Sequence, residues 1–202
     1  MSLSFIPPQL PTLVETPPEG AEWVHEIKYD GYRTQQIIED GTVRLLTRNG
    51  HEWTARYPAI AAAATRLGVE NAMIDGEAVI LVDGRPDYHA LRRAAATKRS
   101  DVMSLVAFDL LHLNGHDLRN MPLEDRRHLL ADLVGLDPGA IFFSQGVVSP
   151  GADFYQAVEK LELEGMVSKR ADSRYLSGAA AAALTRHFYA LSAYYSPRSA
   201  FG

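Results

Sequence analysis

The chain has 202 residues, no cysteine and a formal net charge of −5. A chain of this length buries enough surface to fold without a disulfide or a structural zinc, and the lack of cysteine excludes thiolate metal sites and cysteine nucleophiles. An apolar fraction of 47% and a charged fraction of 22% are typical of a globular protein. No apolar run is long enough for a membrane span, and the N-terminus lacks the features of a signal peptide, so we expect a cytoplasmic protein.

The basic residues are dominated by arginine. There are only four lysines, Lys28, Lys98, Lys160 and Lys169, so few candidates exist for a lysine with special chemistry. Residues 1–172 carry a charge of −8 and residues 173–202 a charge of +3. The acidic balance argues against a broad surface that coats DNA without specificity, but it leaves room for a local basic site.

Taken in chain order, the pattern predicts an α+β fold with largely antiparallel sheets. Residues 1–20 hold five prolines and predict an extended lead-in. Residues 72–82 form two short apolar runs separated by Asp75 and Gly76, which we interpret as a break. Strands are predicted at 23–28, 33–38, 42–47, 103–109, 140–144 and 165–169. Helices are predicted at 56–67, 87–96, 122–134 and 152–163.

The most informative segment spans residues 26–33, with the sequence Glu-Ile-Lys-Tyr-Asp-Gly-Tyr-Arg. It places Lys28, Asp30 and Arg33 where a strand meets a turn. A Lys-x-Asp-Gly-x-Arg string arises by chance on the order of once in a thousand chains of this composition. The alternative is a surface turn with a Lys–Asp pair worth under about 1 kcal/mol. The residues of this segment alone leave both interpretations open.

This segment resembles the nucleotide-binding motif of covalent nucleotidyltransferases, and it is most similar to bacterial ATP-dependent DNA ligases of the end-joining type. Further motifs of that family follow in its order, at residues 47–50, 74–77, 108–115 and 164–169. The resemblance implies an adenylation domain at 21–178, with two largely antiparallel sheets, flanking helices and an ATP-grasp-like fold. It leaves residues 179–202 as a divergent tail rich in alanine and aromatic residues.

The resemblance also implies a chemistry. Lys28 would attack the α-phosphate of ATP to form lysyl-AMP, and the AMP would pass to the 5′-phosphate of nicked DNA during repair or recombination. A free lysine has a pKa of about 10.4, so its nucleophilic form needs burial or neighbouring cations. The implied ATP-binding residues are Glu26, Ile27, Arg33, Arg48, Glu77, Phe108 and Lys169, with Phe108 stacked on adenine. Glu77 and Glu164 are the implied Mg²⁺ ligands.

The implied partners are ATP, nicked or broken double-stranded DNA and end-joining proteins, in the bacterial cytosol or nucleoid and away from any membrane.

Each site residue has a simpler alternative. Phe108 alone would be a core aromatic residue, Glu77 a charge at a strand edge, and Arg48 a solvated turn residue. Asp30 and Asp75 are either turn-builders or site residues, and we favour turn-building for Asp75.

The chain departs from the family after Gly178. The family continues with a strand bearing Trp-x-Lys-x-Lys and then an OB-fold domain, whereas residues 179–202 contain no lysine and no tryptophan. We therefore expect no OB-fold domain in this chain and impaired ligation, and we hypothesise a frame change or truncation after Gly178. The alternative for the tail is an amphipathic helix at 179–195. Two alternative functions remain. One is an RNA ligase or capping-type nucleotidyltransferase, and the other is a non-catalytic nucleotide- or DNA-binding remnant.

Overall fold

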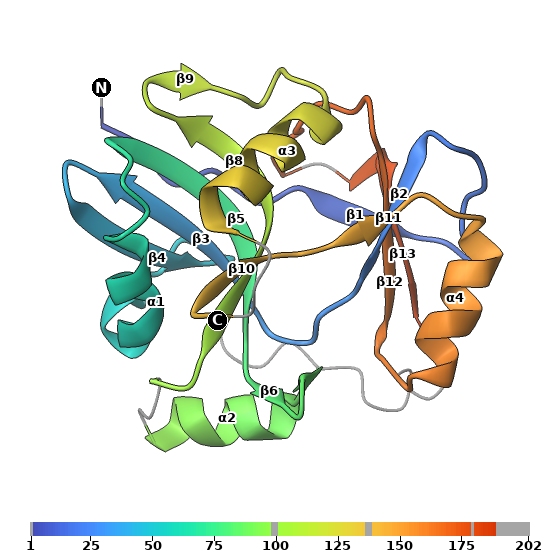
Figure 1. Ribbon diagram of the computed structural model, residues 1–202, viewed down its shortest axis with the longest axis horizontal. Coiled ribbons are helices and arrows are strands. Elements are labelled where there is room, and N and C mark those ends of the chain that lie inside the picture. Colours follow the sequence, from blue (N-terminus) through green and yellow to red (C-terminus); the bar gives the residue numbers. More distant parts are fainter. Residues whose placement is uncertain (1, 98–100, 136–138, 179, 189–202) are drawn as a thin grey trace.

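The computed structural model describes residues 2–97, 101–135, 139–178 and 180–188. Two β-sheets lie side by side, with helices on their outer sides (Figure 1). The large sheet contains β3 (Tyr32–Glu39), β4 (Thr42–Thr47), β5 (Asn71–Val79), β8 (Ser104–Leu113), β9 (His116–Asp117) and β10 (Ile141–Phe143). The small sheet contains β1 (Leu10–Leu13), β2 (Trp23–Ile27), β11 (Gly146–Val147), β12 (Gly165–Arg170) and β13 (Ala180–Phe188).

The large sheet has the order β10-β8-β5-β3-β4, with β9 paired to β8, and only the β10–β8 pair is parallel. Neighbouring positions along its strands are both apolar and both buried, as at Ile37 and Ile38 or Leu45 and Leu46. Because side chains alternate between faces, both faces of this sheet must be covered. The main core lies on the face that holds Ile38 and Leu45, under α1 (Pro58–Ala64), α2 (Tyr88–Thr97) and α3 (Leu123–Val134).

The N-terminal segment covers part of the other face. Leu3, Phe5 and Ile6 pack against a second cluster that includes Ile37 and Leu46. The Gln35 amide holds this segment by two hydrogen bonds of 2.9 Å, since it accepts from the Ile6 N–H and donates to the Ile6 carbonyl. The proline-rich lead-in is thus packed along the large sheet before it forms β1.

The small sheet has the order β1-β13-β12-β2-β11, and only the β1–β13 pair is parallel. The helix α4 (Gly151–Lys160) packs against β12 and β2, on the side away from the large sheet (Figure 1). A short hairpin of β6 (Leu81–Val82) and β7 (Arg85–Pro86) connects β5 to α2.

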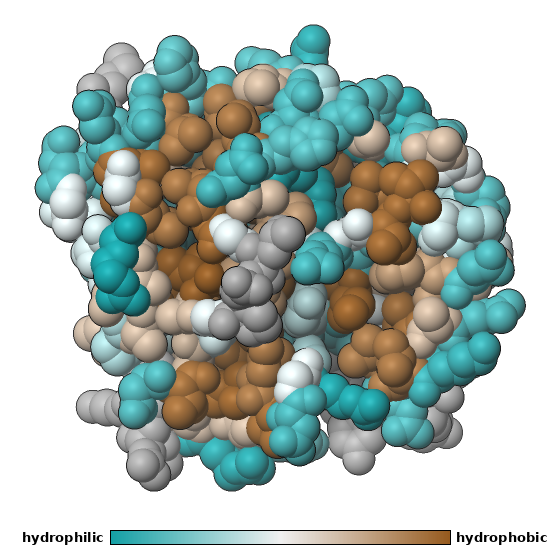
Figure 2. All heavy atoms as spheres, in the orientation of Figure 1, coloured by the Kyte–Doolittle hydropathy of each residue, from teal (hydrophilic) through white to brown (hydrophobic). Residues whose placement is uncertain are grey.

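On the face shown in Figure 2, hydrophobic residues gather in the middle and hydrophilic residues on the rim. None of the helices in the described residues is both long and apolar enough to cross a membrane.

The predicted fold class, with two largely antiparallel sheets and flanking helices, is confirmed. One local prediction and one alternative are wrong. The expected break at Asp75 and Gly76 lies inside the continuous strand β5, where a shift of register towards β8 absorbs the irregularity. The helix given as the alternative for 179–195 is not formed over residues 180–188, which are a strand, because the free edge of β12 takes up this segment as a hydrogen-bonded neighbour. Residues 179 and 189–195 of that expectation lie outside the described residues.

Gly76 is required by the close approach of β5 to β8. A Cβ built there would lie 2.7 Å from the Val106 carbonyl oxygen, and a backbone atom cannot move aside as a side chain could. We expect Gly76→Ala to destabilise the fold by about 2–3 kcal/mol, measured by urea unfolding. The control is Gly68→Ala, where φ is +69° but no atom lies within 4 Å, and we expect a cost of about 1 kcal/mol. Equal losses for both variants would contradict the steric explanation.

Candidate active site

A cavity of about 370 Å³ lies between the two sheets. The large sheet contributes Arg33, Glu77 and Phe108, and the small sheet contributes Glu26 and Lys169. Every residue predicted from the sequence to hold ATP or to act as the nucleophile lines this cavity: Glu26, Ile27, Lys28, Arg33, Arg48, Glu77, Phe108 and Lys169. Since these residues come from five separate parts of the chain, only the fold brings them together.

Lys28 follows directly after the last residue of β2. Its backbone N–H donates to the Gly165 carbonyl at 2.9 Å, which extends the pairing of β2 with β12 by one residue. Its Nζ lies 2.5 Å from Oε1 of Glu164, and both side chains are largely buried. The predicted nucleophile and one of the two predicted metal ligands therefore form an ion pair at the cavity.

Glu26 is the centre of a buried charge cluster at the site. One carboxylate oxygen, Oε1, lies 2.6 Å from Nη1 of Arg127 and 2.7 Å from Nζ of Lys169. The other, Oε2, accepts a hydrogen bond of 2.8 Å from the Ser144 hydroxyl. Burial lowers the pKa of Lys169, and the carboxylate of Glu26 opposes this shift. The cluster joins the small sheet to α3 and to the residue that follows β10 of the large sheet.

Arg33 is held by a residue that sequence analysis assigned to a turn. Its Nε and Nη2 each donate to a different oxygen of Asp75 at 2.7 Å, in a bidentate pair, and Asp75 is fully buried. The expectation that Asp75 builds a turn is therefore wrong, because this residue faces β3 from the middle of β5. Burial alone would lower the pKa of Arg33, but the Asp75 carboxylate raises it above its usual range. Arg33 also lies with its Cζ 4.5 Å from the centre of the Phe108 ring.

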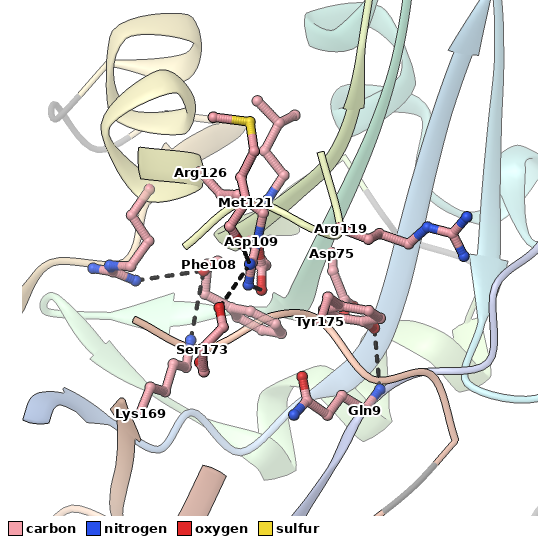
Figure 3. Close-up of polar contacts among 12 residues, drawn as sticks. Gln9, Asp75, Phe108, Asp109, Arg119, Met121, Arg126, Lys169, Ser173 and Tyr175 are labelled. Carbon is pink, nitrogen blue, oxygen red and sulfur yellow. Dashed lines mark hydrogen bonds and ion pairs between the residues drawn. The ribbon is translucent and has the colours of Figure 1, made fainter. Parts of the chain in front are cut away.

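Phe108 lies in β8 and lines the cavity. The Nζ of Lys169 is 4.6 Å from its ring centre and 3.5 Å from its carbonyl oxygen, as Figure 3 shows for the carbonyl contact. Phe108 is thus not a residue of the main core but the aromatic wall of a charged cavity. Arg48 follows β4 and is exposed at the cavity, and Ile27 lies beside the nucleophile.

Two carboxylates near Lys28 have raised pKa values. Burial raises the pKa of Glu77 to about 7, with Glu164 acting in the same direction and Arg33 and Lys28 against it. Burial and the nearby Glu164 raise the pKa of Asp30 to about 6. No group of three or more acidic or histidine side chains arranged to hold a metal is found among the described residues. Glu77 and Glu164 interact electrostatically, and two carboxylates could hold a cation that completes its coordination with phosphate oxygens and water.

The residues that hold the site in place were not predicted from the sequence. They are Arg127, Ser144, Tyr175 and the pair of Arg126 with Asp109. The Arg126 guanidinium makes a bidentate pair with Asp109, at 2.7 and 2.9 Å, and donates to the Met121 and Ser173 carbonyls (Figure 3). One signal was available. Leu123, Arg126, Arg127 and Leu130 have the spacing of a single helix face and are all buried, so two arginines replace apolar residues on the inner face of α3.

Arg127→Met tests the Glu26 cluster. The variant keeps much of the side-chain volume but leaves the buried Glu26 carboxylate with one cation fewer. Removal of one partner of a buried ion pair costs about 3–5 kcal/mol, and because Lys169 remains, we expect about 2–3 kcal/mol in urea unfolding. The exposed Arg119→Met is the matched control, since Arg119 pairs with Asp117 at the surface, and we expect less than about 1 kcal/mol there. Similar losses for the two variants would contradict the assigned role.

Glu77 makes stability depend on pH. Because its folded pKa of about 7 lies above the ordinary value of 4.5, its contribution to stability is complete below about pH 4.5 and is lost as the pH rises through 7. Wild type should therefore lose stability between pH 5 and pH 8 relative to Glu77→Gln. Allowing for the partial exposure of the side chain, we expect a difference on the order of 1–2 kcal/mol. Parallel pH profiles from urea unfolding of the two proteins would refute this expectation.

Comparisons with known proteins agree with this geometry. Residues 10–185 match the protein family described as the ATP dependent DNA ligase domain. The multifunctional non-homologous end joining protein LigD of Pseudomonas aeruginosa is 46% identical over 175 residues, which cover 86% of this chain and 21% of that protein. LigD of Mycobacterium bovis is 34% identical over 161 residues, which cover 79% of this chain and 21% of that protein. The chain thus spans about a fifth of the length of these relatives.

Solved structures show the same relationship. A mycobacterial DNA ligase D complexed with ATP and MES has a TM-score of 0.79 and 30% identity, over 91% of this chain and 60% of that one. The ligase domain of LigD from M. tuberculosis has a TM-score of 0.77 and 31% identity, over 90% of this chain and 58% of that one. The family match over most of the chain shows that this protein belongs to the ATP-dependent DNA ligases, as an adenylation domain of the bacterial end-joining type.

Proposed function

We propose that this chain carries out the first step of DNA ligation, the transfer of AMP from ATP to Lys28. The observation that supports it is the position of the Lys28 amine, at a cavity whose walls hold five further cations beside an aromatic ring: Arg33, Arg48, Arg126, Lys169 and Arg186. Cations placed around a reacting phosphate stabilise the charge that develops on its oxygens. An aromatic wall offers a surface for a planar base without asking for hydrogen bonds.

The step balances as follows. The lone pair of the Lys28 amine bonds to the α-phosphorus, the bond from that phosphorus to the bridging oxygen breaks, and pyrophosphate leaves with the bonding electrons. The protonated amine loses one proton before attack and a second as the nitrogen–phosphorus bond forms, and it keeps the third. The Glu164 carboxylate, at 2.5 Å, accepts the first, and the departing pyrophosphate or water takes the second. The product is a phosphoramidate that holds AMP on Lys28. Arg33, Arg48 and Lys169 would contact the ribose and the phosphates, while Phe108 would stack on the base.

We place Mg²⁺ at Glu77 and Glu164. The donor set fits, since both carboxylates interact with Lys28 and with each other, and hard oxygen ligands suit this ion. Bound there, the ion would neutralise phosphate charge. Glu164 would then share its carboxylate between the ion and the Lys28 amine, which loosens the ion pair that otherwise holds the nucleophile.

The second and third steps would use nicked or broken double-stranded DNA. The relatives named above are bacterial end-joining proteins, which supports a role in DNA repair with end-joining partners in the bacterial cytosol or nucleoid. The family's Trp-x-Lys-x-Lys lysines have no counterpart after Gly178. We therefore propose that the chain forms lysyl-AMP but seals nicks poorly.

The assay for this function is covalent labelling. Incubation with ATP labelled at the α-phosphate and Mg²⁺, followed by a denaturing gel, should give a labelled protein band that pyrophosphate removes. We expect Lys28→Ala to abolish the band, and mass spectrometry of wild type to place one AMP on Lys28. Lys160→Ala is the matched control, because Lys160 ends α4 outside the cavity, and it should label normally.

The alternatives give different results in the same assay. Labelling by GTP and not by ATP would favour a capping-type nucleotidyltransferase. Binding of ATP without any covalent adduct on wild type would favour the non-catalytic remnant and would overturn the proposal.

A further inference from the structure

The hydroxyl group of Tyr175 lies at the end of a hydrogen-bonded chain that leads to the cavity. It donates to Oδ2 of Asp75 at 2.7 Å, and the same carboxylate makes the bidentate pair with Arg33. The guanidinium of Arg33 in turn lies against the Phe108 ring. Tyr175 comes from the segment after β12, whereas Asp75, Arg33 and Phe108 come from three strands of the large sheet. A residue 100 positions away from Asp75 thus completes the support of Arg33.

The protonation states of these groups determine which of them donate and which accept in this series of hydrogen bonds. Burial raises the pKa of Tyr175, and the Asp75 carboxylate raises it further, so the hydroxyl keeps its proton and donates. Asp75 is fully buried and accepts three hydrogen bonds, two from Arg33 and one from Tyr175. A carboxylate with several short donors has little freedom to rotate, and a charge-assisted bidentate pair transmits its orientation to the guanidinium.

The N-terminal segment also hydrogen-bonds to Tyr175, on the side opposite Asp75 in this hydrogen-bond network. The Gln9 backbone N–H donates to the Tyr175 hydroxyl oxygen at 3.1 Å, as Figure 3 shows. The loop around Tyr175 also bonds to this segment through the Ser177 hydroxyl, which donates to the Pro7 carbonyl at 2.8 Å. Gln9 and Tyr175 are both buried and both line the cavity. The N-terminal segment, the loop after β12 and the large sheet therefore meet at one hydroxyl group.

We infer that Tyr175 is a positioning residue for the nucleotide, which acts through Asp75 to hold Arg33 in the orientation that contacts ATP. This inference rests on the proposed function for the identity of the ligand. Tyr175 is joined to Arg33 by hydrogen bonds through the Asp75 carboxylate, so its loss leaves the Arg33 charge in place but frees its direction. The cost then appears as weaker binding of ATP and not as loss of the nucleophile.

The test measures ATP binding by titration calorimetry in the Lys28→Ala background, so that no covalent step contributes. Tyr175→Phe keeps the ring in the second hydrophobic cluster and removes only the hydroxyl. We expect the Kd for ATP to rise about tenfold, and Asp75→Asn to give a rise of the same order. Tyr57→Phe is the matched control, since Tyr57 is as buried but belongs to the main core and does not line the cavity, and its Kd should be unchanged.

A double-substitution cycle separates positioning from direct contact. In an Arg33→Met background, Tyr175→Phe should have no further effect on the Kd, because it acts through Arg33. An unchanged Kd for Tyr175→Phe alone would overturn the inference. So would a full tenfold effect that persists without Arg33, which would mean that the hydroxyl contacts ATP itself.

A second measurement keeps the inference testable if the parent protein binds no ATP, a result that would reject the proposed function. The Nε–Hε resonance of Arg33 in NMR spectra reports how firmly its guanidinium is held. We expect slow exchange with solvent in the parent protein and in Tyr57→Phe, and exchange about tenfold faster in Tyr175→Phe. Equal exchange rates in all three proteins would overturn the inference whether or not ATP binds.

Discussion

The buried carboxylate of Glu26 is the constraint on which the arrangement of the two sheets depends. An isolated carboxylate in a protein interior is strongly unfavourable unless cations and hydrogen bonds satisfy it. Glu26 and Lys169 belong to the small sheet, whereas Arg127 belongs to α3, which packs on the large sheet, and Ser144 follows the parallel strand β10. Satisfying this carboxylate therefore requires both sheets to be in place. The cavity lies between these two sheets.

The same requirement explains why three cations of the cavity are each paired with a carboxylate. Lys28 contacts Glu164, Arg33 contacts Asp75 and Lys169 contacts Glu26. Three cations confined to one cavity without carboxylates would repel one another and would favour their neutral or unfolded states. The pairing keeps each cation directed and charged, at the expense of some of its attraction for phosphate. Preorganised groups of this kind need little rearrangement when charge develops on a phosphate oxygen. Glu77, with its raised pKa, is the carboxylate whose charge is least favoured, which suits a residue that would gain a cation together with the ligand.

Much of this could be predicted from the sequence, because local signals carry most of the secondary structure. Strand β4 begins and ends at the predicted residues, and α2 and α3 lie within one residue of theirs. The ordered motifs also led to the residues that line the cavity. The supporting residues could not be predicted in this way, because their partners are far away in the chain. Asp75 looks like a turn residue beside a glycine, and only the neighbouring strand β3 and the distant Tyr175 reveal it as a buried anchor. Gly76 likewise looks like a break but permits a close contact between two strands.

In the C-terminal strand β13, backbone pairing determines the secondary structure although the side chains favour a helix. Residues 180–188 have the alanine-rich composition that favours a helix, yet they form β13 between β1 and β12. Strand pairing uses backbone N–H and C=O groups that every residue but proline carries, and the unpaired edges of β1 and β12 leave a position that any extended segment can fill. The family match extends to residue 185, into the segment that has lost the family's lysines. The fold therefore tolerates a change of side chains here. Arg186, which lies opposite Val167 and lines the cavity, is the cation that the described part of this strand brings to the site in their place.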